Sequence, residues 1–317
     1  MAIPVLITID TELTWRHHSV GRDWEENFAR SIEPASVGIR YQLRLLARYG
    51  LKAVFFVDPM PAMVFGIEPI RRIVTPILEA GQDVQLHLHP NWTGASAADP
   101  AAHAAFELTS YDEMEQRSLI AGARDLLVAA GAPTPTAFRA GSFAANDPTL
   151  RALAAMGLRY DSSHNGSQLP WPCEIGLPSG QIAPVMREGI IELPVTQIEQ
   201  APGRMRHLQV CAVSSAELAS ALRHAWRERH PLVNLVSHSF ELASRDGSRA
   251  NRIVARRFER LCAFLAAERA RLVTVHIRDI DGIALDAEAR PMRSSLWRTA
   301  GRVAEQFLSN IEHRASA

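Results

Sequence analysis

Short apolar runs alternate with longer stretches of helical periodicity along most of the chain. Residues 5–9 form a nearly continuous, β-branched apolar run, which is typical of a strand buried on both faces. Comparable runs predict further strands at 52–57, 84–89, 136–140, 159–164, 190–195, 232–237 and 272–277. The stretches between them have the apolar spacing of helices, at 35–49, 68–80, 112–130, 147–156, 215–229 and 252–269.

This repeated order of strand, helix and strand predicts parallel strands joined by right-handed crossovers. Polar clusters recur where strands end and not where they begin, which favours an α/β barrel with its chemistry at the carboxyl face. An open doubly wound sheet is the alternative, but no glycine-rich phosphate loop follows the first strand. We expect one domain over residues 1–317, with a helical tail from about 290.

Composition narrows the class of protein. The 317 residues are 47% hydrophobic, enough for a full core, and the net charge of zero argues against a general nucleic-acid binder. The three cysteines are far apart and predict neither disulfides nor a metal site, as expected in a reducing compartment. The N-terminus lacks the features of a signal peptide, and no apolar run reaches the length of a membrane span. We therefore expect a cytoplasmic protein without a membrane span.

Two histidines mark the end of the third predicted strand. His87 and His89 alternate with Leu86 and Leu88, so both imidazoles stand on one face, and Pro90 ends the strand just beyond them. Imidazole is the commonest neutral metal ligand and is suited to proton transfer near neutral pH. Half-buried histidines bonded to backbone would explain this pair equally well, so the interpretation depends on the other strand ends.

Four other strand ends also carry ionisable or polar side chains. Bringing such groups together is costly unless a metal ion or a substrate charge compensates them. Carboxylates with histidines suit Zn²⁺ or a similar divalent ion, while a spare carboxylate and a spare histidine could carry protons. These residues are Asp10 with Glu12, Arg139, Asp161 with His164, and His238.

The order and placement of these motifs resemble the polysaccharide deacetylase family, also called the NodB-homology domain or carbohydrate esterase family 4. The resemblance is greatest to the branch with Asp-x-Glu and His-Leu-His-Pro motifs, and it spans five ordered motifs from residue 5 to about 240. It implies a distorted (β/α)7 barrel. It also implies a metal-dependent hydrolase, with zinc as the expected ion, that removes an acyl group, in the first place acetyl, from an N-acylated amino sugar or glycan.

The resemblance also assigns roles to individual residues. Asp10 is similar to the family's catalytic base, Arg139 to the arginine that pairs with that base, and His238 to the general acid. His89, Trp92 and Asp161 are then expected in or beside the substrate pocket.

The metal ligands depart from the family pattern. Many members have a carboxylate directly after the base, where this chain has Thr11, so Glu12 is the expected ligand. His87 matches the first histidine of a His-x-x-x-His pair, and the second falls on Asn91, which is therefore the third expected ligand. An amide oxygen suits harder cations better than Zn²⁺, so metal affinity should be weakened, unless His89 takes its place.

Two alternatives to the deacetylase remain open. Because Asn91 replaces a histidine ligand, the barrel could bind a glycan without turning it over. The same residues would also suit a hydrolase of another non-peptide C–N bond, in a cyclic amide or a formyl group. The sequence leaves the oligomeric state open.

Overall fold

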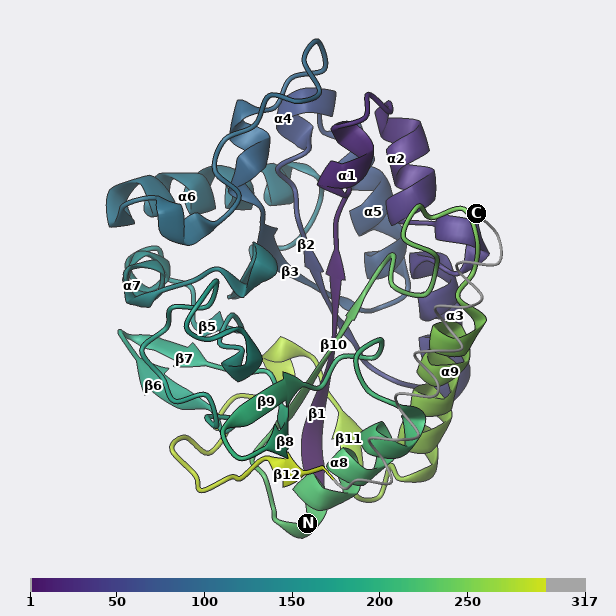
Figure 1. Ribbon diagram of the computed structural model, residues 1–317, viewed down its shortest axis with the longest axis vertical. Helices are drawn as coiled ribbons and strands as arrows, with labels where there is room; N and C mark the ends of the chain where they lie inside the picture. Colours follow the sequence, from purple (N-terminus) through teal and green to yellow (C-terminus); the bar gives the residue numbers. More distant parts are fainter. Residues whose placement is uncertain (1, 295–317) are drawn as a thin grey trace.

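The computed structural model describes residues 2–294, and one curled sheet forms its centre (Figure 1). The strand order is β10-β1-β2-β3-β4-β5-β7-β6, and β11 pairs with the start of β1. All of these pairings are parallel except that of β6 with β7. The strands are β1 (Ile3–Thr11), β2 (Val54–Val57), β3 (Asp83–Leu88), β4 (Ala137–Ala140), β5 (Tyr160–Asp161), β6 (Val185–Arg187), β7 (Ile190–Glu192), β10 (Val233–His238) and β11 (Leu272–Thr274).

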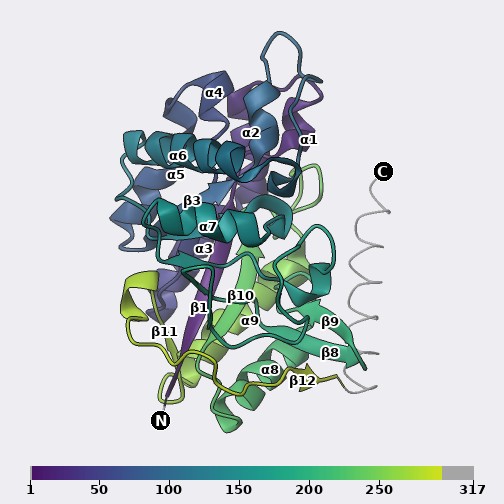
Figure 2. The ribbon, with the colours of Figure 1, turned by 90° about the vertical axis from the view of Figure 1, so that its left-hand side faces the viewer.

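Helices cover the outer face of this sheet, with α3 and α9 on one side and α6 and α7 on the other (Figures 1 and 2). Their ends follow local sequence signals: α3 stops at Gly50, whose φ of 64° is left-handed, and α6 begins with a capping box of Asp112 and Glu115. The helices are α1 (Trp15–His18), α2 (Trp24–Ser31), α3 (Ile39–Tyr49), α4 (Ala62–Phe65), α5 (Glu68–Glu79), α6 (Glu113–Ala129), α7 (Asp147–Ala155), α8 (Ser215–Arg227) and α9 (Arg252–Ala267).

The sheet curls into a distorted barrel, in which irregular contacts and not a regular strand pairing join the segment after β7 to β10. The Asn234 side-chain amide donates to the Leu193 carbonyl at 2.8 Å, and the Thr196 N–H donates to the Asn234 carbonyl at 2.9 Å. The predicted fold class, an α/β barrel with a distorted (β/α)7 arrangement, is confirmed.

The inner face of the strands changes from apolar to polar along their length. Near the amino ends, Leu6, Val54 and Ala137 pack together inside the barrel. Two residues further along the same strands, the inner positions hold Thr8, Phe56 and Arg139, and Asp10 follows at the end of β1. The outward residues of these strands pack against the helices. This gradient places the ionisable groups at the carboxyl ends of the strands.

Several segments differ from the sequence prediction. The stretch from 12 to 33, which has no apolar periodicity, contains α1 and α2. The region after β7 forms a second sheet of β12 (Met292–Arg293), β8 (Gln197–Ala201) and β9 (Arg204–His207). Residues 290–294 contain the strand β12, which pairs with β8, and no helix. The remainder of the expected helical tail lies outside the described residues. None of the helices within 2–294 is long and apolar enough to cross a membrane.

Candidate active site

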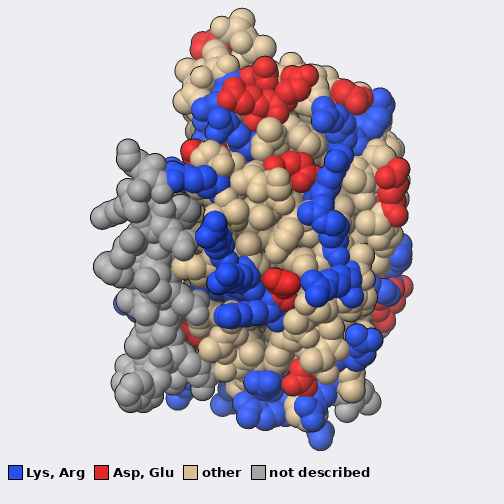
Figure 3. Space-filling model, turned by 90° about the vertical axis from the view of Figure 1, so that its right-hand side faces the viewer, with Lys and Arg blue, Asp and Glu red and all other residues tan. Residues whose placement is uncertain are grey.

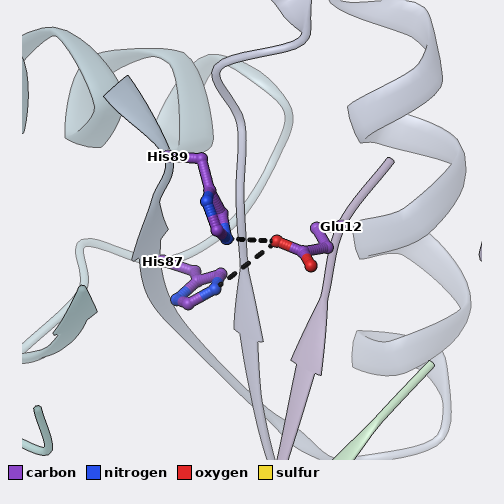
Figure 4. Close-up of side chains that lie close together, drawn as sticks. All are labelled: Glu12, His87 and His89. Atoms are coloured by element: carbon purple, nitrogen blue, oxygen red, sulfur yellow. Dashed lines mark ion pairs between the residues drawn. The ribbon is translucent and has the colours of Figure 1, made fainter. Parts of the chain in front are cut away.

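Three side chains that could bind a metal ion meet where β1 and β3 end (Figure 4). The His89 Nε2 lies 2.5 Å from Glu12 Oε2, and the His87 Nε2 lies 3.7 Å from the same oxygen. One ligand atom from each residue lies within 4.8 Å of the other two. The alternation of side chains along β3 brings the two imidazoles to one face, as the sequence predicts. Glu12 reaches them from the end of β1, on the far side of β2.

The backbone of β4 holds His87 in the tautomer that a metal ligand needs. The His87 Nδ1 lies 2.8 Å from the carbonyl oxygen of Arg139, which can only accept a hydrogen bond. The Nδ1 therefore carries the proton, and the Nε2 lone pair faces Glu12. Burial lowers the pKa of His87 to about 4, so this imidazole is neutral near pH 7.

Without a metal ion, Glu12 and His89 form an ion pair. Burial alone would raise the pKa of Glu12, but His89 overcomes this effect and lowers it to about 2. Burial alone would lower the pKa of His89, but attraction to Glu12 raises it to about 9. The side chains of Glu12 and His89 are 13% and 20% exposed, so an ion could reach the pair from solvent. A cation that replaces the His89 proton would meet an ionised carboxylate.

The donor set and its spacing fit a divalent ion. Two imidazole nitrogens and one carboxylate oxygen are a ligand set of catalytic zinc sites, which leave a fourth position open. Bonds of about 2.1 Å in tetrahedral geometry separate neighbouring ligand atoms by roughly 3.4 Å. The distances of 2.5 Å and 3.7 Å around Glu12 Oε2 bracket that value. Small side-chain movements would therefore suffice.

A buried ion pair joins Asp10 to Arg139 directly beside this cluster. The Arg139 Nη1 donates to Asp10 Oδ1 at 2.7 Å and to Thr8 Oγ1 at 2.9 Å. The Nε and Nη2 of the same guanidinium donate to the carbonyl and the hydroxyl of Ser162 at 3.0 Å and 2.8 Å. Burial alone would raise the pKa of Asp10, but Arg139, together with His87 and His238, outweighs burial, and the pKa is lowered. Asp10 is therefore an ionised carboxylate fixed in one orientation.

His238 lies across from Asp10 on the neighbouring strand. Asp10 and His238 are register partners of β1 and β10, and the His238 Nε2 is 3.7 Å from Asp10 Oδ2. On the other side of the ring, Nδ1 lies 3.1 Å from the Gln209 side-chain nitrogen and 3.5 Å from Glu241 Oε2. Burial opposes protonation, but Glu241 and Asp10 together raise the pKa of His238. An imidazole in this position can hold a proton on Nε2 and face the pocket with it.

The sequence prediction missed three residues of this site. Glu241 accepts hydrogen bonds from Ser237 at 2.6 Å and from Gln209 at 2.9 Å, and it supports His238. Asp58 is fully buried after β2; burial, with Glu12 adding to it, raises its pKa to about 7 despite nearby His89. Asp58 follows an apolar strand, so the strand-end rule could have found it. Gln209 carries no such signal.

The remaining predicted site residues lie at the edge of the cluster or below it. Asn91 is 1% exposed, and its side-chain nitrogen has no hydrogen-bond partner in the described part of the chain. Its role as a metal ligand stays a prediction. Trp92 is also 1% exposed, and its ring packs edge-on against Trp15 and Phe65. No face of this indole is free to stack on a sugar, so the structure does not support its predicted contact with substrate.

Asp161 lies beneath the pocket and is linked to the strand β4 through a hydrogen bond to Ser163. Its Oδ1 accepts a hydrogen bond from the Ser163 hydroxyl at 2.8 Å, and that hydroxyl accepts one from the Ala140 N–H at 2.9 Å. The side chain is fully buried, so it does not reach substrate. Burial raises the pKa of Asp161 and that of neighbouring Glu192, and the proximity of Asp161 raises the pKa of Glu192 further.

An open cavity of about 660 Å³ adjoins His238. Gln209 and Glu241 line it together with Phe143, and Trp171 contributes an indole that is 65% exposed. A cavity of this size accommodates one or a few sugar rings.

The chain has the fold of polysaccharide deacetylases. A candidate polysaccharide deacetylase from Mycobacterium smegmatis superposes with a TM-score of 0.57 at 18% identity, over 92% of this chain and 94% of that chain. The predicted resemblance is thereby confirmed at the level of the fold.

Two further solved structures are more distant. A family 4 carbohydrate esterase from Streptomyces lividans has a TM-score of 0.45 and 14% identity, over 90% of this chain and 97% of that chain. A family 4 pseudoenzyme from Bacillus anthracis has a TM-score of 0.46 and 13% identity, over 93% of this chain and 70% of that chain. No family model and no curated protein matches the sequence.

A glycine makes room for the His89 ring, which leads to a first prediction. A Cβ on Gly141 would lie 2.4–2.7 Å from Nδ1, Cε1 and Cγ of His89. We expect Gly141→Ala to push the ring away from Glu12 and to lower the pKa of His89 from about 9 towards its ordinary value of 6.5, as measured by NMR titration of the imidazole. Gly122→Ala is the control, since its Cβ would meet nothing within 4 Å. An unchanged pKa of His89 in Gly141→Ala would contradict this account.

Proposed function

We propose that this protein is a metal-dependent hydrolase that removes an acyl group, acetyl in the first place, from an N-acylated amino sugar or glycan. The observation that supports this proposal is that the Glu12–His87–His89 cluster, an ionised Asp10 and His238 lie close together at the carboxyl ends of the strands. The deacetylase fold supports the same conclusion, because it accounts for the placement of these groups at the strand ends.

The metal ligands in this proposal are Glu12, His87 and His89, so that His89 takes the place predicted for Asn91. His87 already has its Nε2 free, and His89 must lose one proton to bind. Zinc held by these three residues would supply a Lewis acid for the amide carbonyl and would acidify a water molecule.

The chain's own residues move the protons. Asp10 accepts a proton from the attacking water, and Arg139 keeps this carboxylate ionised and oriented. His238 donates its Nε2 proton to the nitrogen of the departing amine, so the C–N bond breaks with a neutral leaving group. On the opposite side of the protonated ring, Nδ1 faces the carboxylate of Glu241, which also accepts a hydrogen bond from Gln209. The base and the acid are thus two neighbouring groups whose pKa values are shifted in opposite directions.

Turnover tests the proposal directly. We expect Asp10→Asn and His238→Ala each to lower kcat by about 10²–10⁴-fold, because each removes one positioned proton carrier. The measurement is release of acetate or formate from a panel of N-acyl amino sugars with zinc added. His103→Ala is the matched control, because His103 is exposed and lies outside the cluster.

Two results would count against this proposal. Equal release from wild type, Asp10→Asn and His238→Ala would mean that the activity lies elsewhere. No release from the wild type over the whole panel, with glycan binding retained, would favour a binding barrel.

The pH dependence of the rate tests the role of Glu241. Asp10 must be ionised, and its pKa is lowered from the ordinary value of 3.8, so the base is ionised near neutral pH. His238 must be protonated, and its raised pKa places the alkaline limb above 6.5. Glu241→Gln removes a negative charge that raises the pKa of His238, so we expect the alkaline limb to move to lower pH while the acid limb stays in place.

The control for this experiment is Glu107→Gln, which also lines the cavity but has no contact with His238. An alkaline limb that moves equally in both variants, or in neither, would remove Glu241 from its assigned role.

A further inference from the structure

Two arginines line the cavity beside His238 without a carboxylate partner. Arg16, in α1, is half-buried, and its Nη1 donates to the backbone carbonyl of Arg245 at 2.8 Å. Arg245 follows β10, and its side chain is exposed. Neither guanidinium forms an ion pair with any residue between 2 and 294. Their positive charges are therefore left for a ligand.

Some arginines of the outer surface do have carboxylate partners. On the face that carries α3 and α9, basic and acidic side chains are interspersed (Figure 3). Arg40 lies 3.5 Å from Glu33, and Arg48 lies 3.5 Å from Glu259. Arg44 in α3 has no carboxylate partner within residues 2–294, so what distinguishes Arg16 and Arg245 is that both line the cavity.

The local charges do not cancel within the cavity. Burial lowers the pKa of Arg16, and repulsion by Arg245 lowers it further, while Glu12 acts weakly in the opposite direction. Of the two carboxylates in the cavity wall, Glu241 is already paired with His238. Glu107 is then the one remaining carboxylate in a cavity wall that contains two arginines. The cavity consequently has an excess of positive charge.

This positive charge lies close to the proposed leaving group. The guanidinium carbon of Arg16 lies 5.1 Å from the ring centre of Phe240, and that ring lies 5.1 Å from the ring of His238. One aromatic ring therefore separates the proposed acid from Arg16. Trp171 lines the same cavity with an exposed indole, on which a sugar ring can stack.

We propose that the substrate carries an anionic group, a phosphate or a carboxylate, on the N-acylated amino sugar or directly beside it, and that Arg16 and Arg245 bind this group. The inference rests on the proposed function for the reaction, but the arginine site can be tested without turnover. A guanidinium presents several N–H donors in a planar fork, which suits both anions, and half-burial strengthens such charge-assisted hydrogen bonds. A neutral amino sugar would offer neither guanidinium an opposite charge.

The kinetic test compares three substrates. N-acetylglucosamine is neutral, N-acetylglucosamine 1-phosphate carries a phosphate, and N-acetylmuramic acid carries a carboxylate. We expect the wild type to prefer at least one anionic substrate, and the one it prefers identifies the anion. Arg16→Gln should lower kcat/KM for that substrate by about 10-fold or more and change kcat/KM for N-acetylglucosamine less than about twofold.

Three further variants make this test specific. Arg245→Gln should also lower kcat/KM for the preferred anionic substrate. This substitution keeps the backbone carbonyl that Arg16 contacts, so it can replace Arg16→Gln as the test if that variant does not fold. Arg16→Lys should recover part of the preference because it keeps the charge. Arg44→Gln removes a charge from α3 outside the cavity and should leave the preference unchanged.

A binding experiment separates this inference from the proposed function. Calorimetry on metal-free protein measures the affinity for N-acetylglucosamine 1-phosphate where no metal ion can bind the phosphate. If Arg16→Gln and Arg245→Gln both weaken this binding, the arginine site is supported, even if no substrate is turned over. In that case only the proposed function fails. Turnover with no anionic preference, or a preference that both arginine variants retain, would overturn the arginine site and leave the proposed function standing.

Discussion

The site depends on one buried ion pair, between Arg139 and Asp10. Arg139 is fully buried, and its guanidinium makes hydrogen bonds to Thr8, Asp10 and Ser162, which belong to β1 and to the segment after β5. Removing one partner of such a pair costs about 3–5 kcal/mol, because the other charge stays buried without compensation. The backbone carbonyl of Arg139 also orients His87. The orientation of Asp10, the proposed base, and the tautomer of His87, a proposed metal ligand, therefore both depend on the position of β4.

The barrel makes this arrangement possible by separating two kinds of inner residue. Apolar side chains fill the barrel near the amino ends of the strands, so only the carboxyl ends open into a polar pocket. Phe56 lies at the boundary, with the guanidinium carbon of Arg139 4.5 Å from its ring centre. Burial beside this apolar layer is costly for each charge, and for that reason the charges occur as pairs: Asp10 with Arg139, Glu12 with His89, and Glu241 with His238.

Much of this organisation can be predicted from the sequence, because strand periodicity decides which side chains share a face. The alternation through His87 and His89 placed both imidazoles correctly, and the strand-end rule led to Asp10 and His238. Contacts between distant segments carry no local signal: Gln209 reaches His238 from the segment after β9, and β12 pairs with β8 across about 90 residues of chain. Trp92 shows that a position directly after a strand does not decide whether a side chain reaches the pocket. Its position after β3 suggested a pocket residue, but packing against Trp15 and Phe65 buries it.

Anomalous diffraction at the zinc edge, from crystals of the zinc-loaded protein, tests directly whether Glu12, His87 and His89 form the metal centre. If they do, we expect one strong peak within bonding distance, about 2.0–2.2 Å, of Glu12 and of the Nε2 atoms of His87 and His89. The ion pair between Glu12 and His89 should then be replaced by two bonds to the metal. A peak bound by Asn91 with His89 still paired to Glu12, or no peak between β1 and β3, would contradict this assignment.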